Sequence, residues 1–248
     1  MAKFAVIFPA AGRSERFRDK KKKPFVELDG RAIWVRAVEP FLNRDDVVQL
    51  LLVIAAEDRE EVERRYRANL AFMGVRLVDG GAERHDSVAA ALAQLAPDVD
   101  YVAVHDAVRP CVTKELIDSV FRAAVEHGAA IPAIAVSDTV KRVDETTKRI
   151  RETVPRRGLW LAQTPQAFRR DWLEEAYRQR SSEVEVTDDA QLVERVGHPV
   201  TVVDGSALNV KITTRQDLAL ARAALQALPK PKPKGPLHPF AEDQMWQS

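Results

Sequence analysis

An α/β fold, with a mostly parallel sheet covered by helices on both faces, is what this sequence predicts. Two observations support it. Short runs of apolar residues alternate along the chain with amphipathic segments of helical length. Several of these runs are apolar at every position, which is typical of parallel strands buried on both faces. The expected architecture is therefore Rossmann-like, and ligands of such sheets bind beyond the carboxyl ends of the strands.

The elements are expected in order from the N-terminus. Apolar runs predict strands at 4–8, 47–55, 75–79, 101–106 and 129–136. Amphipathic segments predict helices near 31–42, 58–72, 85–95, 114–127 and 215–227. Two helices are expected to begin at capping boxes, formed by Asp58 with Glu61 and by Thr214 with Asp217. Asp86 or Ser87 is the expected N-cap of the helix at 85–95.

The alternation breaks after residue 136, where β-branched and charged residues alternate around "DETTK" (144–148). Residues 137–158 are therefore expected to form a protruding β-arm of two strands. Such an arm is not stable alone, so we expect it to pack on a partner subunit in a homodimer. After a single domain at 1–228, residues 229–248 are rich in Pro and Lys and are expected to form a mobile tail.

The overall charge argues against one class of function. The 248 residues include 38 Lys and Arg against 37 Asp and Glu, a formal net charge of +1. General nucleic-acid binders carry excess positive charge over a whole face, so nucleic acid is not expected as a partner. The single cysteine, Cys111, excludes a disulfide within the chain and favours a reducing compartment. No signal peptide or membrane-length apolar run is found, and a cytoplasmic location is expected.

Positive charge is nevertheless concentrated at one place. Seven of the eleven residues from Arg13 to Lys23 are Arg or Lys, and they follow the first predicted strand. Ala10, Ala11 and Gly12 carry no bulk, so backbone N–H groups there can approach a phosphate closely. The G-x-G-x-x-G and Walker A motifs are both absent. On these residues alone, a solvated basic loop is as reasonable an interpretation as a triphosphate site.

An ordered set of motifs gives a more specific indication. The set is "PAAGRSERF" (9–17), "DGGAERHDSV" (79–88), "VHDAVRP" (104–110), "DTVKR" (138–142), "RGLWLAQTPQAF" (157–168), "VTDDAQLVE" (186–194) and "NVKIT" (209–213). In this order and spacing the motifs closely resemble those of the 2-C-methyl-D-erythritol 4-phosphate cytidylyltransferases, enzymes of non-mevalonate isoprenoid biosynthesis. The resemblance covers residues 4 to about 225.

This resemblance implies a reaction and a cofactor. Such enzymes transfer a cytidylyl group from CTP to 2-C-methyl-D-erythritol 4-phosphate, giving 4-(cytidine 5′-diphospho)-2-C-methyl-D-erythritol and pyrophosphate. The attacking phosphate oxygen is already anionic, so positioning and electrostatics rather than a general base should carry the catalysis. Mg²⁺ is the expected cofactor, with Asp106 as its ligand. The alternative is that Asp106 caps the next segment or pairs with Arg109.

The resemblance also implies roles for individual residues. Arg16 and Lys23 correspond to the cations that stabilise the transition state, with Lys22 as the alternative to Lys23. The nucleotide is expected to contact Ala10, Ala11, Gly12, Gly81, Arg84, Ser87 and Asp106. The acceptor is expected to be positioned by Thr139, Arg156, Thr164 and Lys211. Because Thr139 and Arg156 flank the arm, part of the site is expected to come from the neighbouring subunit.

Two nearby side chains are given ordinary roles. No second histidine lies at ligand spacing from His105, which is expected to order its loop rather than to bind metal. Cys111 is expected to be a small packing residue and not a nucleophile.

Three other functions are left open by the sequence. A cytidylyltransferase for another polyol phosphate, such as ribitol 5-phosphate, would share the fold and much of the CTP site. A non-catalytic nucleotide-binding domain would be favoured by loss of a reactive cation or of the metal carboxylate, yet Arg16, Lys23 and Asp106 are all present. A nucleic-acid binder using the lysine run would bind with a steep salt dependence, and the near-neutral charge argues against it.

Overall fold

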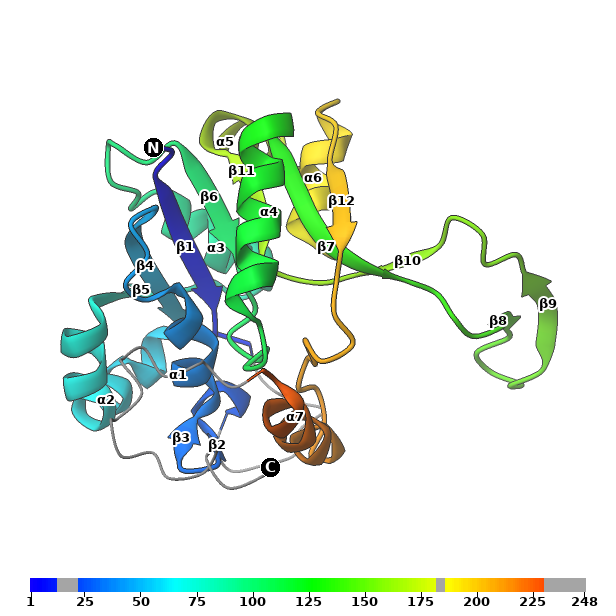
Figure 1. The fold of residues 1–248 in the computed structure, drawn as a ribbon, viewed down its shortest axis with the longest axis horizontal. Coiled ribbons are helices and arrows are strands. Elements are labelled where there is room, and N and C mark those ends of the chain that lie inside the picture. Colours follow the sequence, from blue (N-terminus) through cyan, green and yellow to red (C-terminus); the bar gives the residue numbers. More distant parts are fainter. Residues whose placement is uncertain (13–21, 182–185, 230–248) are drawn as a thin grey trace, which may run out of the picture.

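An eight-stranded sheet lies at the centre of the computed structural model (Figure 1), which describes residues 1–12, 22–181 and 186–229. Its parallel half is built around β1 (Phe4–Pro9), which pairs with β4 (Val47–Ile54) on one side and β6 (Tyr101–Val104) on the other. β5 (Val75–Asp79) pairs with the other edge of β4. These four strands confirm the predicted apolar runs, although β6 ends two residues before the expected boundary.

The other half of the sheet is mixed. β7 (Ala129–Ala135) was predicted, whereas the three strands that pair with it were not. The neighbours are β11 (Gln166–Arg169), antiparallel to both β6 and β7; β10 (Trp160–Ala162), antiparallel to β7; and β12 (Thr201–Asp204), parallel to β7. The sheet is thus mostly parallel, as the sequence predicts.

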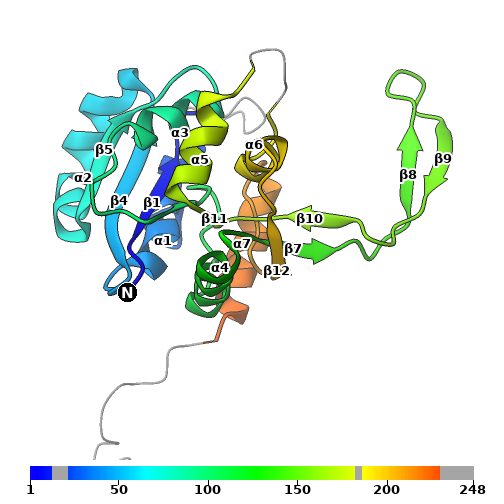
Figure 2. The same ribbon diagram turned by 90° about the horizontal axis from the view of Figure 1, so that it is seen from above.

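Helices cover both faces of the sheet (Figures 1 and 2), because side chains alternate along its strands. On β1, Phe4, Val6 and Phe8 point into one core, and Ala5 and Ile7 point into the other. The first core is closed by α1 (Ile33–Val38), α2 (Arg59–Met73) and α4 (Lys114–His127). The second is closed by α3 (Arg84–Leu92), α5 (Arg170–Arg178) and α6 (Asp189–Arg195).

Helix starts differ from the expected caps. Asp58 makes no capping hydrogen bond to α2, because its carboxylate pairs instead with the Lys22 ammonium, 2.7 Å between Oδ2 and Nζ; the predicted capping box is wrong. The N-cap of α3 is Glu83, and Asp86 reaches back to it from the third helical position. The predicted N-caps of this helix are therefore wrong. Glu83 takes the role because the helix begins earlier than expected.

Two other helical regions depart from the expected bounds. The segment at 31–42 is divided between a short hairpin, α1 and a 3-10 turn, and proline at position 40 stands inside that turn. The hairpin pairs β2 (Glu27–Leu28) with β3 (Arg31–Ala32), and the turn is η3 (Glu39–Phe41). α7 (Gln216–Ala227) begins one residue later than predicted, and its N-cap is Arg215. Asp217, in its first turn, accepts hydrogen bonds from the backbone N–H groups of Thr213 and Thr214.

The predicted arm is a β-hairpin that projects from the body in both views (Figures 1 and 2). β8 (Val140–Val143) and β9 (Ile150–Val154) pair antiparallel and form a sheet of their own. At the tip, the Asp144 carboxylate accepts hydrogen bonds from the backbone N–H groups of Thr146 and Thr147. The Thr147 N–H and the Arg151 guanidinium lower the pKa of Asp144 to about 2, so the turn is held by an ionised carboxylate.

A membrane-spanning helix is not found in the described ranges: each helix there is too short or too polar to cross a bilayer. The predicted tail at 229–248 lies outside the described residues, except for its first position.

Candidate active site

The carboxyl ends of the parallel strands meet at one edge of the sheet. Backbone hydrogen bonds continue past the strand ends there: Ala10 N–H donates to Val53 O (2.7 Å), Gly80 N–H to Ile54 O (2.7 Å) and His105 N–H to Ile7 O (2.8 Å). The three loops that follow β1, β5 and β6 are thereby fixed beside one another. They carry the residues that the sequence predicts to bind a nucleotide.

Gly80 lies at a close approach between two of these loops. A Cβ at this position would lie 2.6 Å from Ser87 Oγ and 2.9 Å from the Ala11 Cβ, distances that real Cβ atoms do not show. Gly81 is equally constrained, because its Cβ would lie 2.4 Å from that of Asp86. Only glycine therefore allows Ala11 and Ser87 to be neighbours, which groups part of the predicted nucleotide set.

A cavity of about 230 Å³ opens beside this edge. It is lined by residues from five separate segments: Arg84, Asp106, Arg109, Ala162, Gln163, Thr164, Gln166, Thr187, Asp188 and Lys211. Of the residues predicted for substrate or nucleotide, Arg84, Asp106, Thr164 and Lys211 are brought together here.

Asp106 stands among three cations. Its Oδ2 lies 2.9 Å from Lys211 Nζ and 3.3 Å from Arg109 Nε, and its Oδ1 lies 3.6 Å from Arg84 Nε. Burial by itself would raise the pKa of Asp106, but the three cations outweigh it and hold the pKa below its ordinary value. The carboxylate is therefore ionised at neutral pH, and Lys211, Arg109 and Arg84 give the cavity wall three cations that can bind phosphate.

His105 orders the loop that carries Asp106. It is fully buried, and burial lowers its pKa to about 4, so the ring is neutral. Its Nε2 donates to the Arg109 carbonyl (3.1 Å), which leaves Nδ1 to accept from Thr164 Oγ1 (3.1 Å). The Thr164 hydroxyl oxygen in turn accepts from Asp106 N–H (3.1 Å). The expected ordering role of His105 is confirmed.

Cys111 fills space beneath the same loop. It is buried in the cluster that α7 closes, its Sγ lies 3.5 Å from the Ala221 carbonyl, and burial raises its pKa to about 11. A thiol with that pKa is a poor nucleophile at neutral pH, so the packing role is confirmed.

Comparison with known proteins agrees with this geometry. The family model described as 2-C-methyl-D-erythritol 4-phosphate cytidylyltransferase matches residues 4–227. The chain belongs to this family. A family member of that name from Rhodopirellula baltica is 42% identical over 235 residues, which are 90% of this chain and 95% of the relative. One from Frankia casuarinae is 44% identical over 222 residues, which are 89% of this chain and 80% of the relative.

Solved structures of cytidylyltransferases have the same fold. The crystal structure of 4-diphosphocytidyl-2C-methyl-D-erythritol synthase from Anaerococcus prevotii superposes with a TM-score of 0.77 at 31% identity, covering 91% of this chain and 96% of that one. The crystal structure of the Thermus thermophilus cytidylyltransferase gives a TM-score of 0.75 at 33% identity, covering 90% and 99%. The predicted fold class is confirmed.

The candidate site has a donor set that suits a single Mg²⁺ held jointly with substrate phosphates. No group of three or more metal-ligating side chains occurs among residues 1–12, 22–181 and 186–229. Mg²⁺ is commonly held by one or two carboxylates together with substrate phosphates. Asp106 suits that arrangement, since its Oδ1 faces only the more distant Arg84 Nε while Oδ2 carries the two closer cations.

Of the two predicted catalytic cations, Arg16 and Lys23, the structure describes only Lys23. Arg16 lies outside the described residues. Lys23 begins the 3-10 helix η2 (Lys23–Phe25). The alternative, Lys22, is engaged with the start of α2, where its Nζ lies 2.7 Å from Asp58 Oδ2 and 3.1 Å from Glu57 Oε1. These contacts give Lys22 structural partners. Lys23 stays the predicted catalytic lysine, with Lys22 as the alternative.

Two predicted acceptor residues lie on the arm instead of in the cavity. Thr139 and Arg156 flank β8 and β9, and both are exposed. The Arg156 guanidinium donates to the carbonyl of Ser137, across the base of the arm. Within one chain, therefore, Thr164 and Lys211 are separated from Thr139 and Arg156.

Two buried polar residues at or beside the cavity, Gln163 and Asn209, had no predicted role. Gln163 binds the backbone of Ser206 through both amide atoms, at 2.9 and 3.1 Å, and so fixes the segment that leads to Lys211. Asn209 donates to the Thr164 carbonyl (2.9 Å), and among the described residues its buried Oδ1 has no hydrogen-bond partner. Both residues stand inside motifs quoted above, so their position next to Thr164 and Lys211 was the available signal.

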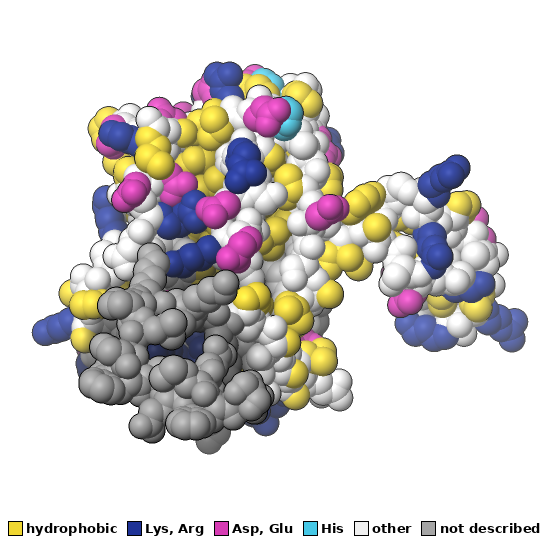
Figure 3. Space-filling view, viewed as in Figure 1, with side chains coloured by type: hydrophobic (Ala, Val, Ile, Leu, Met, Phe, Trp, Pro, Cys, Tyr) yellow, Lys and Arg dark blue, Asp and Glu magenta, His cyan; other side chains and the backbone are white. Residues whose placement is uncertain are grey.

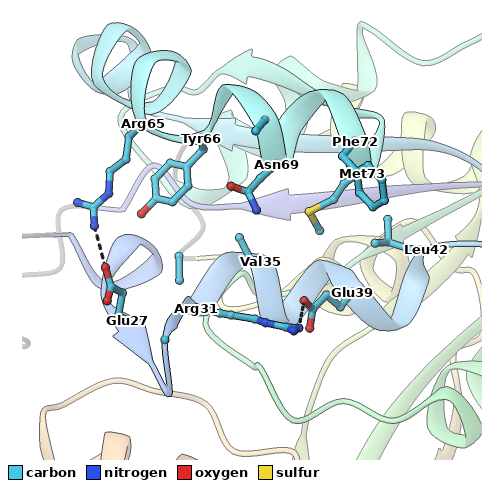
Figure 4. A pocket seen from close by; sticks show the side chains of 13 residues that line it. Glu27, Arg31, Val35, Glu39, Leu42, Arg65, Tyr66, Asn69, Phe72 and Met73 are labelled. Atoms are coloured by element: carbon cyan, nitrogen blue, oxygen red, sulfur yellow. Dashed lines mark hydrogen bonds and ion pairs between the residues drawn. The ribbon is translucent and has the colours of Figure 1, made fainter.

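A larger cavity of about 590 Å³ lies between α1 and α2 (Figure 4). Apolar side chains such as Tyr66 and Met73 line it, and the Arg65–Glu27 ion pair (3.0 Å) stands at one end. It contains none of the predicted site residues. The cavity at Asp106 therefore remains the candidate active site.

Proposed function

We propose that the chain transfers a cytidylyl group from CTP to 2-C-methyl-D-erythritol 4-phosphate, releasing pyrophosphate. The observation that carries the proposal is Asp106 at the carboxyl edge, ionised and surrounded by Lys211, Arg109 and Arg84, beside the glycine loop that follows β5. Membership of the cytidylyltransferase family supplies the two substrates. We further propose that the enzyme acts in the cytoplasm.

The reaction needs electrostatic help more than proton transfer. An oxygen of the acceptor phosphate attacks the α-phosphorus of CTP, a new P–O bond forms, and the bond to the pyrophosphate leaving group breaks. The attacking oxygen is anionic, so no base has to remove a proton. Repulsion between the two polyanions is the main obstacle. Lys211 and Arg109 reduce it for the acceptor phosphate, and Arg16 and Lys23 are proposed to do so for the triphosphate.

Mg²⁺ is proposed as the cofactor, with Asp106 as its protein ligand. When bound, Mg²⁺ would neutralise charge on the phosphate oxygens and orient them. An acceptor phosphate bound in the cavity would give Lys211 and Arg109 a second anion to contact. Asp106 would then be less fully occupied by those two cations.

A homodimer formed through the arm is proposed as the working unit. Exposed apolar side chains are concentrated on the arm and its base: Val143, Ile150, Leu159, Trp160 and Leu161 are 38% to 62% exposed. Figure 3 shows yellow side chains at the junction of arm and body, and Lys and Arg side chains over the arm. An isolated two-stranded hairpin is marginally stable in water. A partner would cover these side chains and would bring its own Thr139 and Arg156 to a site that lacks them within one chain.

The proposed function is tested by pyrophosphate release. The purified chain is assayed with Mg²⁺ and CTP, and with either 2-C-methyl-D-erythritol 4-phosphate or ribitol 5-phosphate; ATP and GTP in place of CTP are the controls. Release that needs CTP and the first acceptor supports the proposal. Release with ribitol 5-phosphate alone would replace the acceptor, and no release with either would favour a non-catalytic nucleotide-binding domain.

A further inference from the structure

The motif "VTDDAQLVE" contains a buried carboxylate that the reaction as described does not use. Asp189 is the first residue of α6 and is 0% exposed. It is not the cap of that helix, because the capping hydrogen bond to Gln191 N–H is made by Asp188. A buried carboxylate is costly unless it is paired, so the partners of Asp189 indicate what it does.

Its two oxygens have different partners. Asp189 Oδ2 accepts from an Arg84 Nη2 at 2.7 Å, and Oδ1 accepts from the Tyr177 hydroxyl at 2.6 Å. Tyr177 belongs to α5, so the hydroxyl ties the carboxylate to a second helix and leaves the other oxygen to Arg84. The nearby anion and burial together raise the pKa of Tyr177 well above its ordinary value, and the hydroxyl remains a donor.

Arg84 thus bridges two carboxylates. Its Nη2 is held by Asp189, and its Nε faces Asp106 Oδ1 across 3.6 Å at the wall of the cavity. Burial by itself would lower the pKa of Arg84, but Asp189 and Asp106 raise it, so the guanidinium is charged. An arginine side chain with several rotatable bonds needs such a second contact to stay in one orientation.

We propose that Asp189 is a positioning residue of the active site, which together with Tyr177 holds the Arg84 guanidinium against Asp106 and the cavity. This inference rests on the proposed function in one respect: it takes Arg84 to contact the nucleotide. The alternative is that Asp189 merely neutralises a buried cation and stabilises the fold. The two roles differ in what Asp189 changes: a positioning residue changes kcat/KM of the folded enzyme through Arg84, whereas a purely stabilising one changes only the free energy of unfolding.

A double-mutant cycle separates them. Asp189→Asn keeps the shape of the side chain and removes its charge; it should lower kcat/KM for CTP about tenfold, the scale typical of outer-shell partners. Arg84→Ala should lower it further, and Asp189→Asn in that background should cost nothing more. Equal losses in both backgrounds would overturn the proposal. Asp46→Asn, which breaks a partly buried pair with Arg44 at 2.8 Å on the opposite core, is the matched control and should leave kcat/KM unchanged.

Two further measurements keep the proposal testable. If Asp189→Asn does not fold, Tyr177→Phe removes only the hydrogen bond to Asp189, and its smaller loss should likewise vanish without Arg84. A crystal structure of whichever of these variants folds requires no activity, so it distinguishes failure of this inference from failure of the proposed reaction. It should show the Arg84 guanidinium displaced from Asp106, and an unmoved Arg84 would overturn the proposal.

Discussion

At the scale of single residues, two adjacent side chains of the site are both buried but differ in charge. Asp106 is ionised because three cations surround it, whereas His105 is neutral because burial lowers its pKa and it has no such surplus of opposite charge. The same burial therefore produces opposite charge states in adjacent residues. The difference lies in which partners face each group, and this determines how each responds to acid.

The stability of the protein should fall in mild acid because of His105. An unfolded imidazole takes up a proton near pH 6.5, whereas the folded one does so only at about pH 4, so protons favour the unfolded chain between these values. We expect the free energy of unfolding to fall by about 3 kcal/mol across this window. Urea unfolding at several pH values measures it. His105→Gln should remove that part of the slope, and an unchanged slope would mean that His105 is not the group responsible.

At the scale of elements, the parallel half of the sheet was predictable and the antiparallel half was not. β1, β4, β5 and β6 are continuous apolar runs, which length and flanking turns identify. β10 is exposed along its whole length, and β11 includes the polar Gln166 and ends at Arg169, so neither has the expected pattern. These short strands are formed by pairing with β7, a tertiary effect that no local pattern contains.

The site shows the same division. Candidate residues such as Gly81 and Asp106 follow apolar strands whose ends are visible in the sequence, and the resemblance of their motifs to the family gave them their predicted roles. Tyr177 and Asp189 could not be given a role, because Asp189 pairs with Arg84, 105 residues away along the chain, and Tyr177 contacts Asp189. The capping box at Asp58 failed for a related reason: Lys22, distant in sequence, takes its carboxylate.

The arm provides the prediction at this scale. Sedimentation velocity should show a dimer at micromolar concentration, and Ile150→Glu on β9 should weaken it about tenfold or more, because a charge replaces an apolar contact. Leu220→Glu is the matched control, since Leu220 on α7 is 60% exposed and Ile150 is 62% exposed. A wild-type monomer, or equal effects of the two substitutions, would contradict dimerisation through the arm.

At the scale of the whole molecule, the charges nearly balance, while charged side chains of both signs are gathered at the candidate site. Arg84, Arg109 and Lys211 line the cavity together with Asp106 and Asp188, and Asp189 pairs with Arg84 from the start of α6, in a protein whose net charge is +1. The fold places this cluster at the edge where four parallel strands end. Function is therefore concentrated in one place, although the composition is that of an ordinary globular protein.

Residues 230–248 should be dispensable for the reaction. α7 ends at Ala227, and Leu228 packs against the apolar cluster that α7 closes over Cys111, so a chain ending at residue 229 keeps the contacts that α7 makes with the described residues. We expect its kcat/KM to stay within about twofold of the full chain. A larger loss in the pyrophosphate assay would show that the C-terminal residues contribute to the site.

The central claim is that cytidylyl transfer takes place at the cavity around Asp106. The most direct test is kcat/KM for CTP-dependent pyrophosphate release by Asp106→Asn, with circular dichroism to verify the fold. Losing the carboxylate that Lys211, Arg109 and Arg84 face should lower kcat/KM by about a hundredfold and weaken the dependence on Mg²⁺. A folded variant with wild-type kcat/KM and an unchanged Mg²⁺ response would contradict the account, since the chemistry would then occur elsewhere.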